Sequence, residues 1–130
     1  HKVLVAQYME GSSVAGGTGD PAMALAVPIE QFRSEYLFHA PTNYETNYVD
    51  ITAPAGAMIT LDGATQAGGT PIGGTGYVLY RVTPLGPGPT GDGNHTITGT
   101  IPFGISVYGY GQDTSYWYPG GLNLKSIVTG

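Results

Sequence analysis

Apolar and polar residues alternate along most of this chain with a period of two, which is the spacing of side chains on a half-buried β-strand. The alternating runs are short, and residues that favour turns separate them. The pattern predicts strands over Lys2–Tyr8, Met23–Val27, Tyr36–His39, Asn47–Thr52, Ala57–Leu61, from Thr65 onward, Tyr77–Val82, His95–Ile101, Ile105–Tyr108 and Tyr116–Tyr118. About nine short strands with tight turns indicate an all-β fold, an antiparallel two-sheet β-sandwich with little or no helix.

Turn residues between these runs predict where the chain reverses. Asp62 and Gly63 separate two alternating runs and suit the tight primed turn of a β-hairpin. Pro28–Arg33 is balanced between the end of a strand and one helical turn, because proline suits the start of a helix and Glu30 complements its dipole. Loops are expected in three segments rich in small residues, Gly11–Gly19, Gly68–Gly76 and Pro84–Gly93.

Composition supports one domain with many turns. The chain has 130 residues, of which 22 are glycine, 10 are proline and 10% are charged. A chain of this length buries roughly two-thirds of the surface that its unfolded form exposes, so we expect residues 1–130 to fold as a single domain. The predicted core comprises Val3, Val5, Leu25, Val27, Phe38, Val49, Ile51, Ile59, Leu61, Val78, Tyr80, Ile97, Ile105 and Val107.

The densest aromatic region follows the last long alternating run. From Tyr108 to Gly111 tyrosine and glycine alternate, so one face of the strand is aromatic and the other has no side chains. A second surface can therefore approach the glycine face closely. Tyr116–Tyr118 then precede Pro119–Gly121, which end the strand in a turn. These rings either pack the core or form an exposed platform for a ligand.

The chain contains a single tryptophan, Trp117, which lies between Tyr116 and Tyr118. In an extended strand Trp117 points away from both tyrosines, so one side of the triplet faces the core if the other faces solvent. One hypothesis places Trp117 at a recognition edge, with Gln112 and Asp113 at its rim as hydrogen-bonding groups. The alternative is that Trp117 is buried and holds the corner of the fold together.

Charge and cysteine content exclude several classes of function. The formal net charge is −5, and Lys2, Arg33, Arg81 and Lys125 are the four cations. No basic surface is available to neutralise phosphates, so nucleic acid is not expected as a partner. No apolar run approaches the roughly 20 residues that span a membrane, and membrane insertion is not expected. The absence of cysteine excludes disulfides and thiolate metal sites.

Candidate chemical groups are sparse, and no catalytic residue is expected. The three histidines, His1, His39 and His95, are far apart in sequence and predict neither a metal site nor a cofactor. Five aspartates are expected to shape turns through hydrogen bonds to the local backbone: Asp20, Asp50, Asp62, Asp92 and Asp113. A loop-bound Ca²⁺ at Asp92–Asn94 or Asp113–Ser115 is left open, because both segments are rich in oxygen ligands but lack the spacing of a calcium loop.

Eight blocks, in order, carry a resemblance to a known family. They are DPAM (Asp20–Met23), PIEQFR (Pro28–Arg33), Tyr36–Phe38, YVDITAP (Tyr48–Pro54), ITLDG (Ile59–Gly63), PIGGTGY (Pro71–Tyr77), PFGISVYGYG (Pro102–Gly111) and SYWYPGGLNL (Ser115–Leu124). Together they resemble the amino-terminal domain of IgGFc-binding protein and the related domain of many bacterial surface proteins. The chain departs from the frequent SYGYP motif of that family at Trp117, so the local surface there is expected to differ.

The resemblance implies a non-enzymatic binding or adhesion domain at the cell surface, within a larger extracellular protein. An extracellular domain without cysteine favours a bacterial origin. The first functional hypothesis is therefore recognition of a glycan or a protein through aromatic rings and neutral polar groups. The alternative is a structural spacer or an oligomeric fibre-head domain, whose glycine and threonine faces contact other copies. An enzyme has the least support.

Overall fold

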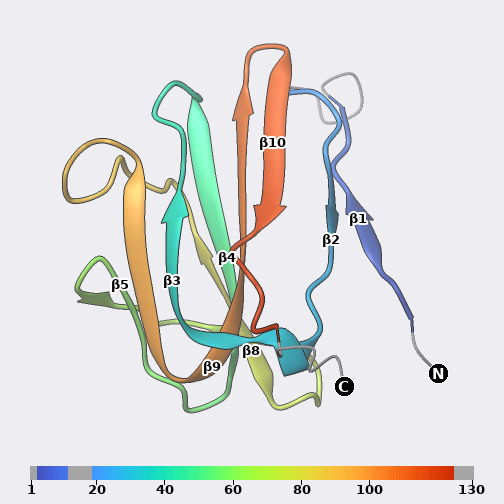
Figure 1. Ribbon diagram of the computed structural model, residues 1–130, viewed down its shortest axis with the longest axis vertical. Coiled ribbons are helices and arrows are strands. Elements are labelled where there is room, and N and C mark those ends of the chain that lie inside the picture. Colours follow the sequence, from blue (N-terminus) through green and yellow to red (C-terminus); the bar gives the residue numbers. More distant parts are fainter. Residues whose placement is uncertain (1–2, 12–18, 125–130) are drawn as a thin grey trace, which may run out of the picture.

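The computed structural model describes residues 3–11 and 19–124. Ten strands and one short 3₁₀ helix make up the described part: β1 (Ala6–Tyr8), β2 (Met23–Leu25), η1 (Ile29–Gln31), β3 (Arg33–His39), β4 (Thr46–Pro54), β5 (Ile59–Leu61), β6 (Ala64–Thr65), β7 (Thr70–Pro71), β8 (Tyr77–Val82), β9 (Asn94–Gly111) and β10 (Thr114–Pro119). All strand pairs in these residues are antiparallel. The predicted all-β, antiparallel two-sheet sandwich is confirmed (Figure 1).

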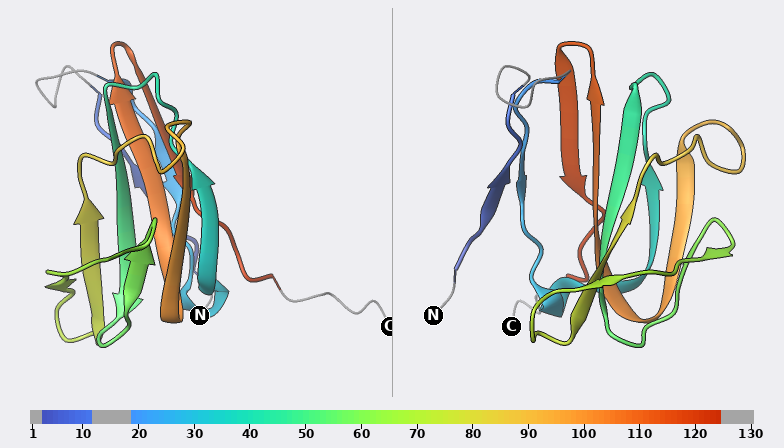
Figure 2. Two further views of the ribbon diagram at one scale, coloured as in Figure 1. Left: turned by 90° about the vertical axis from the view of Figure 1, so that its left-hand side faces the viewer. Right: turned by 180° about the vertical axis from the view of Figure 1, so that it is seen from behind.

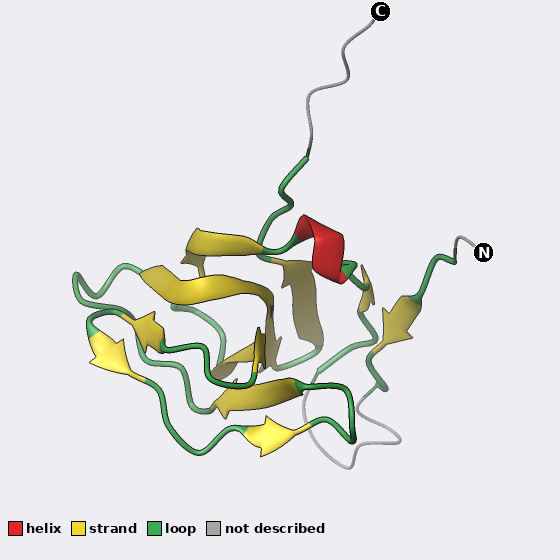
Figure 3. Ribbon diagram, turned by 90° about the horizontal axis from the view of Figure 1, so that it is seen from below, coloured by secondary structure: helices red, strands yellow, loops and turns green. Residues whose placement is uncertain are grey.

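Strand β9 belongs to both layers of the sandwich. Its first part pairs with β3 and β5, and β6 extends that layer beyond β5. Its second part pairs with β4 and β10, and β8 and β7 continue that layer. In Figure 1 the strand descends, curves at the bottom of the view and rises again, and Figure 3 shows the strands around a common interior. The two strands that the sequence predicted here are therefore one bent strand.

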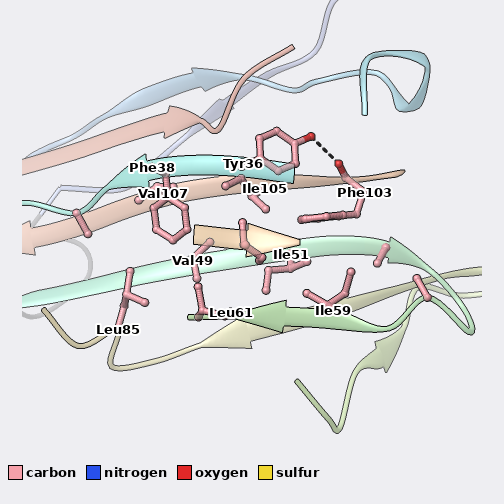
Figure 4. Packing of buried hydrophobic residues seen from close by; sticks show 14 residues of the cluster. Tyr36, Phe38, Val49, Ile51, Ile59, Leu61, Leu85, Phe103, Ile105 and Val107 are labelled. Carbon is pink, nitrogen blue, oxygen red and sulfur yellow. Dashed lines mark hydrogen bonds between the residues drawn. The ribbon is translucent and has the colours of Figure 1, made fainter. Parts of the chain in front are cut away.

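The core lies between the two layers (Figure 4). Eight of the predicted core residues are buried: Phe38, Val49, Ile51, Ile59, Leu61, Ile97, Ile105 and Val107. Val27, Val78 and Tyr80 are half-buried. The sequence prediction missed Phe103, which is fully buried, and Tyr36, whose hydroxyl donates a hydrogen bond to the Phe103 carbonyl oxygen at 2.5 Å. The two rings also meet edge to face, with centroids 5.1 Å apart.

Three predicted core residues are wrong, because Val3, Val5 and Leu25 are exposed. Leu25 lies on β2, and Val3 and Val5 lie just before β1. These two strands form the β1–β2 ribbon, a separate two-stranded sheet outside the sandwich. In Figures 1 and 2 this ribbon runs beside β10, with β2 nearer to β10 and β1 outermost. Alternation of apolar residues predicted strands here correctly. However, β2 meets β10 with only Ala24 buried, and Val3, Val5 and Leu25 lack such cover.

The predicted turns and loops can be compared with the structure one by one. The predicted primed turn is present, because Asp62 and Gly63 both have positive φ, 50° and 83°, between the paired residues Leu61 and Ala64. The segment Pro28–Arg33 contains the 3₁₀ helix η1, and Pro28 is its N-cap. The expected loop Gly68–Gly76 includes the short strand β7. Most of the expected loop Gly11–Gly19 lies outside the described residues. No helix among the described residues is long and apolar enough to cross a membrane.

Candidate functional site

The aromatic segment forms the β9–β10 hairpin, in which Tyr116 pairs with Gly109 and Trp117 pairs with Tyr108. Residues directly opposite each other on antiparallel strands share a face, and successive residues on one strand point to opposite faces. Tyr116 and Tyr118 pack against the hydrophobic core. Trp117 therefore lies with Tyr108 on the outer face of the layer.

Hydrogen bonds fix the two inward tyrosines. The Tyr116 hydroxyl donates to Asn47 Oδ1 at 2.6 Å, and Asn47 Nδ2 donates to the Pro41 carbonyl oxygen at 2.9 Å. The Tyr118 hydroxyl donates to the His39 carbonyl oxygen and accepts the His39 N–H at 3.1 Å. Burial raises the pKa of both tyrosine hydroxyls above the ordinary value. Both side chains therefore serve the packing of β10 against β3 and β4.

The glycine face of β9 is closely approached, as the sequence predicted. A Cβ at Gly109 would lie 2.4 Å from Tyr116 Cε1 and 2.6 Å from Asn47 Oδ1. Both distances are far shorter than a normal contact, so no side chain fits between β9 and the Tyr116 ring. Glycine at this position allows the ring to lie against the strand and so holds Trp117 on the other face.

We expect Gly109→Ala to lower the free energy of unfolding by about 1 to 3 kcal/mol, because the added methyl group displaces the Tyr116 ring. Gly74→Ala is the matched control, since a Cβ at Gly74 meets no atom within 4 Å and Gly74 has no positive φ. The control is expected to change stability by less than about 0.5 kcal/mol. Chemical denaturation of both variants checks this, and equal stabilities would contradict the close approach.

Trp117 is half-buried on the outer face. Its indole Nε1–H donates a hydrogen bond to Ser106 Oγ, and its ring lies 6.2 Å from the Tyr108 ring, centroid to centroid. Tyr108 in turn stacks on Tyr48, with centroids 4.8 Å apart and ring planes 3° apart. The indole is therefore held in one orientation while part of its surface remains in contact with solvent.

A groove of about 420 Å³ runs over this outer face, between the layer and the β2 segment. Trp117, Asp50, Arg81 and Ser106 line it, and Leu25 and Val27 contribute the apolar side that faces them. The volume falls within the range of about 300–1,000 Å³ that is typical of small-molecule sites. The groove therefore combines apolar and aromatic side chains with polar ones. We call it the Trp117 groove.

Asp50 and Arg81 form the charged part of the Trp117 groove. They are opposite each other on β4 and β8, and the guanidinium binds the carboxylate through two hydrogen bonds of 2.9 and 3.0 Å. The Tyr108 hydroxyl also donates to Asp50 Oδ1, at 3.3 Å. The bonds to Asp50 raise the Arg81 pKa, and burial followed by the Asp50 charge raises the Tyr108 pKa. Asp50 was expected to shape a turn, and that prediction is wrong because it lies within β4.

Gln112 and Asp113 form the turn at the tip of the β9–β10 hairpin, and both are exposed. Trp117 lies four residues beyond Asp113 on β10, which corresponds to about 13 Å along an extended strand. The structure therefore does not bring these two side chains to the rim of Trp117. Instead, the structure places Asp50, Arg81 and Ser106 around the groove that Trp117 lines.

His95 and Asp62 form a buried polar contact elsewhere in the fold. His95 Nδ1 lies 2.7 Å from Asp62 Oδ2, and Asp62 Oδ1 accepts the Thr96 N–H at 3.0 Å. The imidazole stacks on Phe38 with centroids 5.0 Å apart. These contacts attach the β5–β6 turn to β9. Asp62 lies in a turn as predicted, but its carboxylate accepts from the distant residues His95 and Thr96 and not from the local backbone.

The remaining candidate groups show local contacts. His39 Nδ1 lies 3.0 Å from Asn94 Oδ1, and His1 lies outside the described residues. Hydrogen bonds from Thr90 and then from Asn94 lower the pKa of Asp92 to about 2. Within residues 3–11 and 19–124 no group of three or more histidine, aspartate and glutamate side chains could hold a metal ion.

Sequence reasoning identified Trp117 but missed Asp50, Arg81 and Ser106. The available signal was the face alternation in β4, because Asp50 lies between the buried residues Val49 and Ile51 and must point outward. Its partner Arg81 is 31 positions away, and only the β4–β8 register identifies it.

Comparison with curated proteins and comparison with solved structures each gave no significant match. The IgGFc binding protein family matches residues 1–109, which include β9 almost to its end; Trp117 follows the matched region. The match covers most of the chain. The chain therefore belongs to the IgGFc binding protein family.

Proposed function

We propose that this domain is an extracellular adhesion module that binds a neutral glycan in the Trp117 groove. The family consists of binding domains and is typically extracellular. The observation that carries the proposal is the position of Trp117, half-buried beside the Asp50–Arg81 pair in a groove of about 420 Å³. A catalytic role has no support from these groups.

The groove offers the two kinds of contact that a sugar requires. The C–H face of a pyranose stacks on an aromatic ring, and its hydroxyls exchange hydrogen bonds with carboxylate and hydroxyl groups. Trp117 supplies the ring, and Asp50, which Arg81 and Tyr108 hold in place, has one acceptor position left on Oδ2. Ser106 accepts the indole N–H and keeps its own O–H as a donor. Side chains already fixed in this way lose little entropy on binding.

The charge distribution favours a neutral ligand. Arg81 is the cation of the groove, and Asp50 neutralises it through two hydrogen bonds. The chain as a whole carries a formal charge of −5, which opposes the approach of sulfated or otherwise anionic glycans. A short neutral saccharide therefore fits the Trp117 groove better than an acidic one.

A glycan array with the purified domain, followed by calorimetric titration of the best neutral saccharide, tests the proposal. Trp117→Ala is expected to weaken binding about tenfold or more, as the loss of an aromatic anchor does. Trp117→Phe keeps a stacking ring and should retain part of the affinity. Asp50→Asn should also weaken binding, because it removes a charged acceptor.

Asp113→Ala is the matched control, since Asp113 lies at the hairpin tip and not in the groove. It should leave affinity unchanged. Thermal unfolding of each variant separates lost contacts from lost structure. The proposal is overturned if Trp117→Ala and Asp50→Asn bind as well as the wild type, or if only Asp113→Ala loses binding.

A further inference from the structure

The β1–β2 ribbon is the least covered apolar part of the described molecule. Val3 is 82% exposed and Leu4 is 78% exposed. The large apolar side chains exposed on the ribbon and the adjoining η1 helix are those of Val3, Leu4, Val5, Tyr8, Met23, Leu25 and Ile29. This concentration of exposed apolar side chains in one part of the fold indicates an interaction surface.

The outer edge of β1 is open. Among the described residues β1 pairs with β2 alone. The Val5 carbonyl oxygen accepts the Ala26 N–H, and the Met9 N–H donates to the Ala22 carbonyl oxygen, so alternate residues from Val5 to Met9 point toward β2. Because main-chain groups alternate between the two edges of a strand, those of Leu4, Ala6 and Tyr8 point to the open edge. An added strand could pair there without breaking any bond to β2.

The sequence of this segment is typical of an interior strand. Val3–Ala6 is apolar on both faces, and Val3–Met9 contains no charged residue and no proline. Exposed edge strands usually carry lysine, proline or a bulge that prevents pairing. Strands buried on both faces read as continuous apolar runs. The segment therefore has the pattern of a strand with a neighbour on each side.

We propose that β1 pairs antiparallel with β1 of a second copy of this chain, around a two-fold axis at Ala6. A two-fold contact uses the same patch on both subunits, and an uncharged strand meets no like charge in its copy. The register that joins the outward main-chain groups places Ala6 opposite Ala6 of the partner subunit and Leu4 opposite Tyr8 of the partner subunit. Two small residues then meet at the axis, with an aliphatic–aromatic pair on either side of it. The two ribbons become one four-stranded sheet without an open β1 edge.

This pairing can be trapped by chemistry, because the chain has no cysteine of its own. In a hydrogen-bonded antiparallel pair the Cα atoms are about 5.5 Å apart, which matches a disulfide. Ala6→Cys should therefore form a covalent dimer quickly under mild oxidation. Leu37→Cys is the matched control, since Leu37 is 75% exposed on β3, away from the ribbon. The control is expected to remain mostly monomeric.

Size-exclusion chromatography with light scattering gives the mass of the unmodified protein, which should be twice that of one chain. Ala6→Pro is expected to yield monomer with unchanged circular dichroism, because the Ala6 N–H faces the open edge and makes no bond to β2. The proposal is overturned if the wild type is monomeric at every concentration, if Ala6→Pro stays dimeric, or if both cysteine variants cross-link equally. Ala6 does not line the Trp117 groove, so Ala6→Pro leaves the groove's own side chains unchanged, and glycan titration of this variant keeps the two proposals distinguishable.

Discussion

Phe103→Ala is expected to lower the free energy of unfolding by about 3 to 5 kcal/mol. The Phe103 ring is fully buried between the layers, at the bend of β9, and packs edge to face against Tyr36. Truncation removes its burial and leaves a cavity that two hydrogen-bonded layers cannot readily close. Urea denaturation followed by circular dichroism measures the loss.

Ile101→Ala is the control for Phe103→Ala, because Ile101 lies on the same strand and is 41% exposed. It should cost less than about 1 kcal/mol, since its side chain is already partly solvated. If the two substitutions lower stability by the same amount, the bend of β9 does not form the centre of the core.

Asp62→Ala is expected to lower the free energy of unfolding by about 2 to 4 kcal/mol. The substitution removes the acceptors for His95 Nδ1 and the Thr96 N–H, and the His95 ring stays buried without them. It also places alanine at a φ of 50°, a conformation that aspartate tolerates better. Thermal and urea unfolding measure the effect.

Asp113→Ala separates the two causes, because Asp113 has nearly the same φ, 52°, at an exposed turn. This control should show the backbone strain alone, about 1 to 2 kcal/mol. Asp62→Asn keeps an acceptor and should recover much of the loss. Equal effects of Asp62→Ala and Asp113→Ala would show that the contact with His95 contributes nothing.

The sequence predicted those parts of the fold that local physics determines. Alternation located β8 at Tyr77–Val82, and the Asp62–Gly63 pair located the turn between β5 and β6. Both features depend only on neighbours in sequence. The length of β9 could not be predicted in this way. Pro102 suggests a break, but it is exposed at the bend between the two layers, where proline is tolerated.

The β1–β2 ribbon shows the limit of the same reasoning. Alternation places apolar side chains on a strand, but it does not say which layer covers that strand. Val3 and Ile59 both belong to alternating apolar runs, whereas Val3 is exposed and Ile59 is buried. Burial depends on the neighbours that the topology supplies, and these come from distant parts of the chain.

For the candidate site, the sequence showed that Trp117 points away from Tyr116 and Tyr118, but it left open which side faces the core, and it did not identify the neighbours of Trp117. Gln112 and Asp113 are near Trp117 in sequence and lie at the other end of the hairpin arm. Asp50 and Ser106 are distant in sequence and lie beside it, because β4 and β9 pair at Asp50 and Ser106. Cross-strand register, which a single sequence does not contain, assembles the Trp117 groove.

The sharing of β9 between both layers also determines when this domain can fold during synthesis. Strands β3, β4 and β5 leave the ribosome before β9, which begins at Asn94 and ends at Gly111 and pairs with all three. Until β9 emerges, β4 can pair with β8 and β5 with β6, whereas β3 has no strand partner among the described residues. Contacts between such distant residues form slowly. The two layers therefore cannot be joined until translation has passed β9.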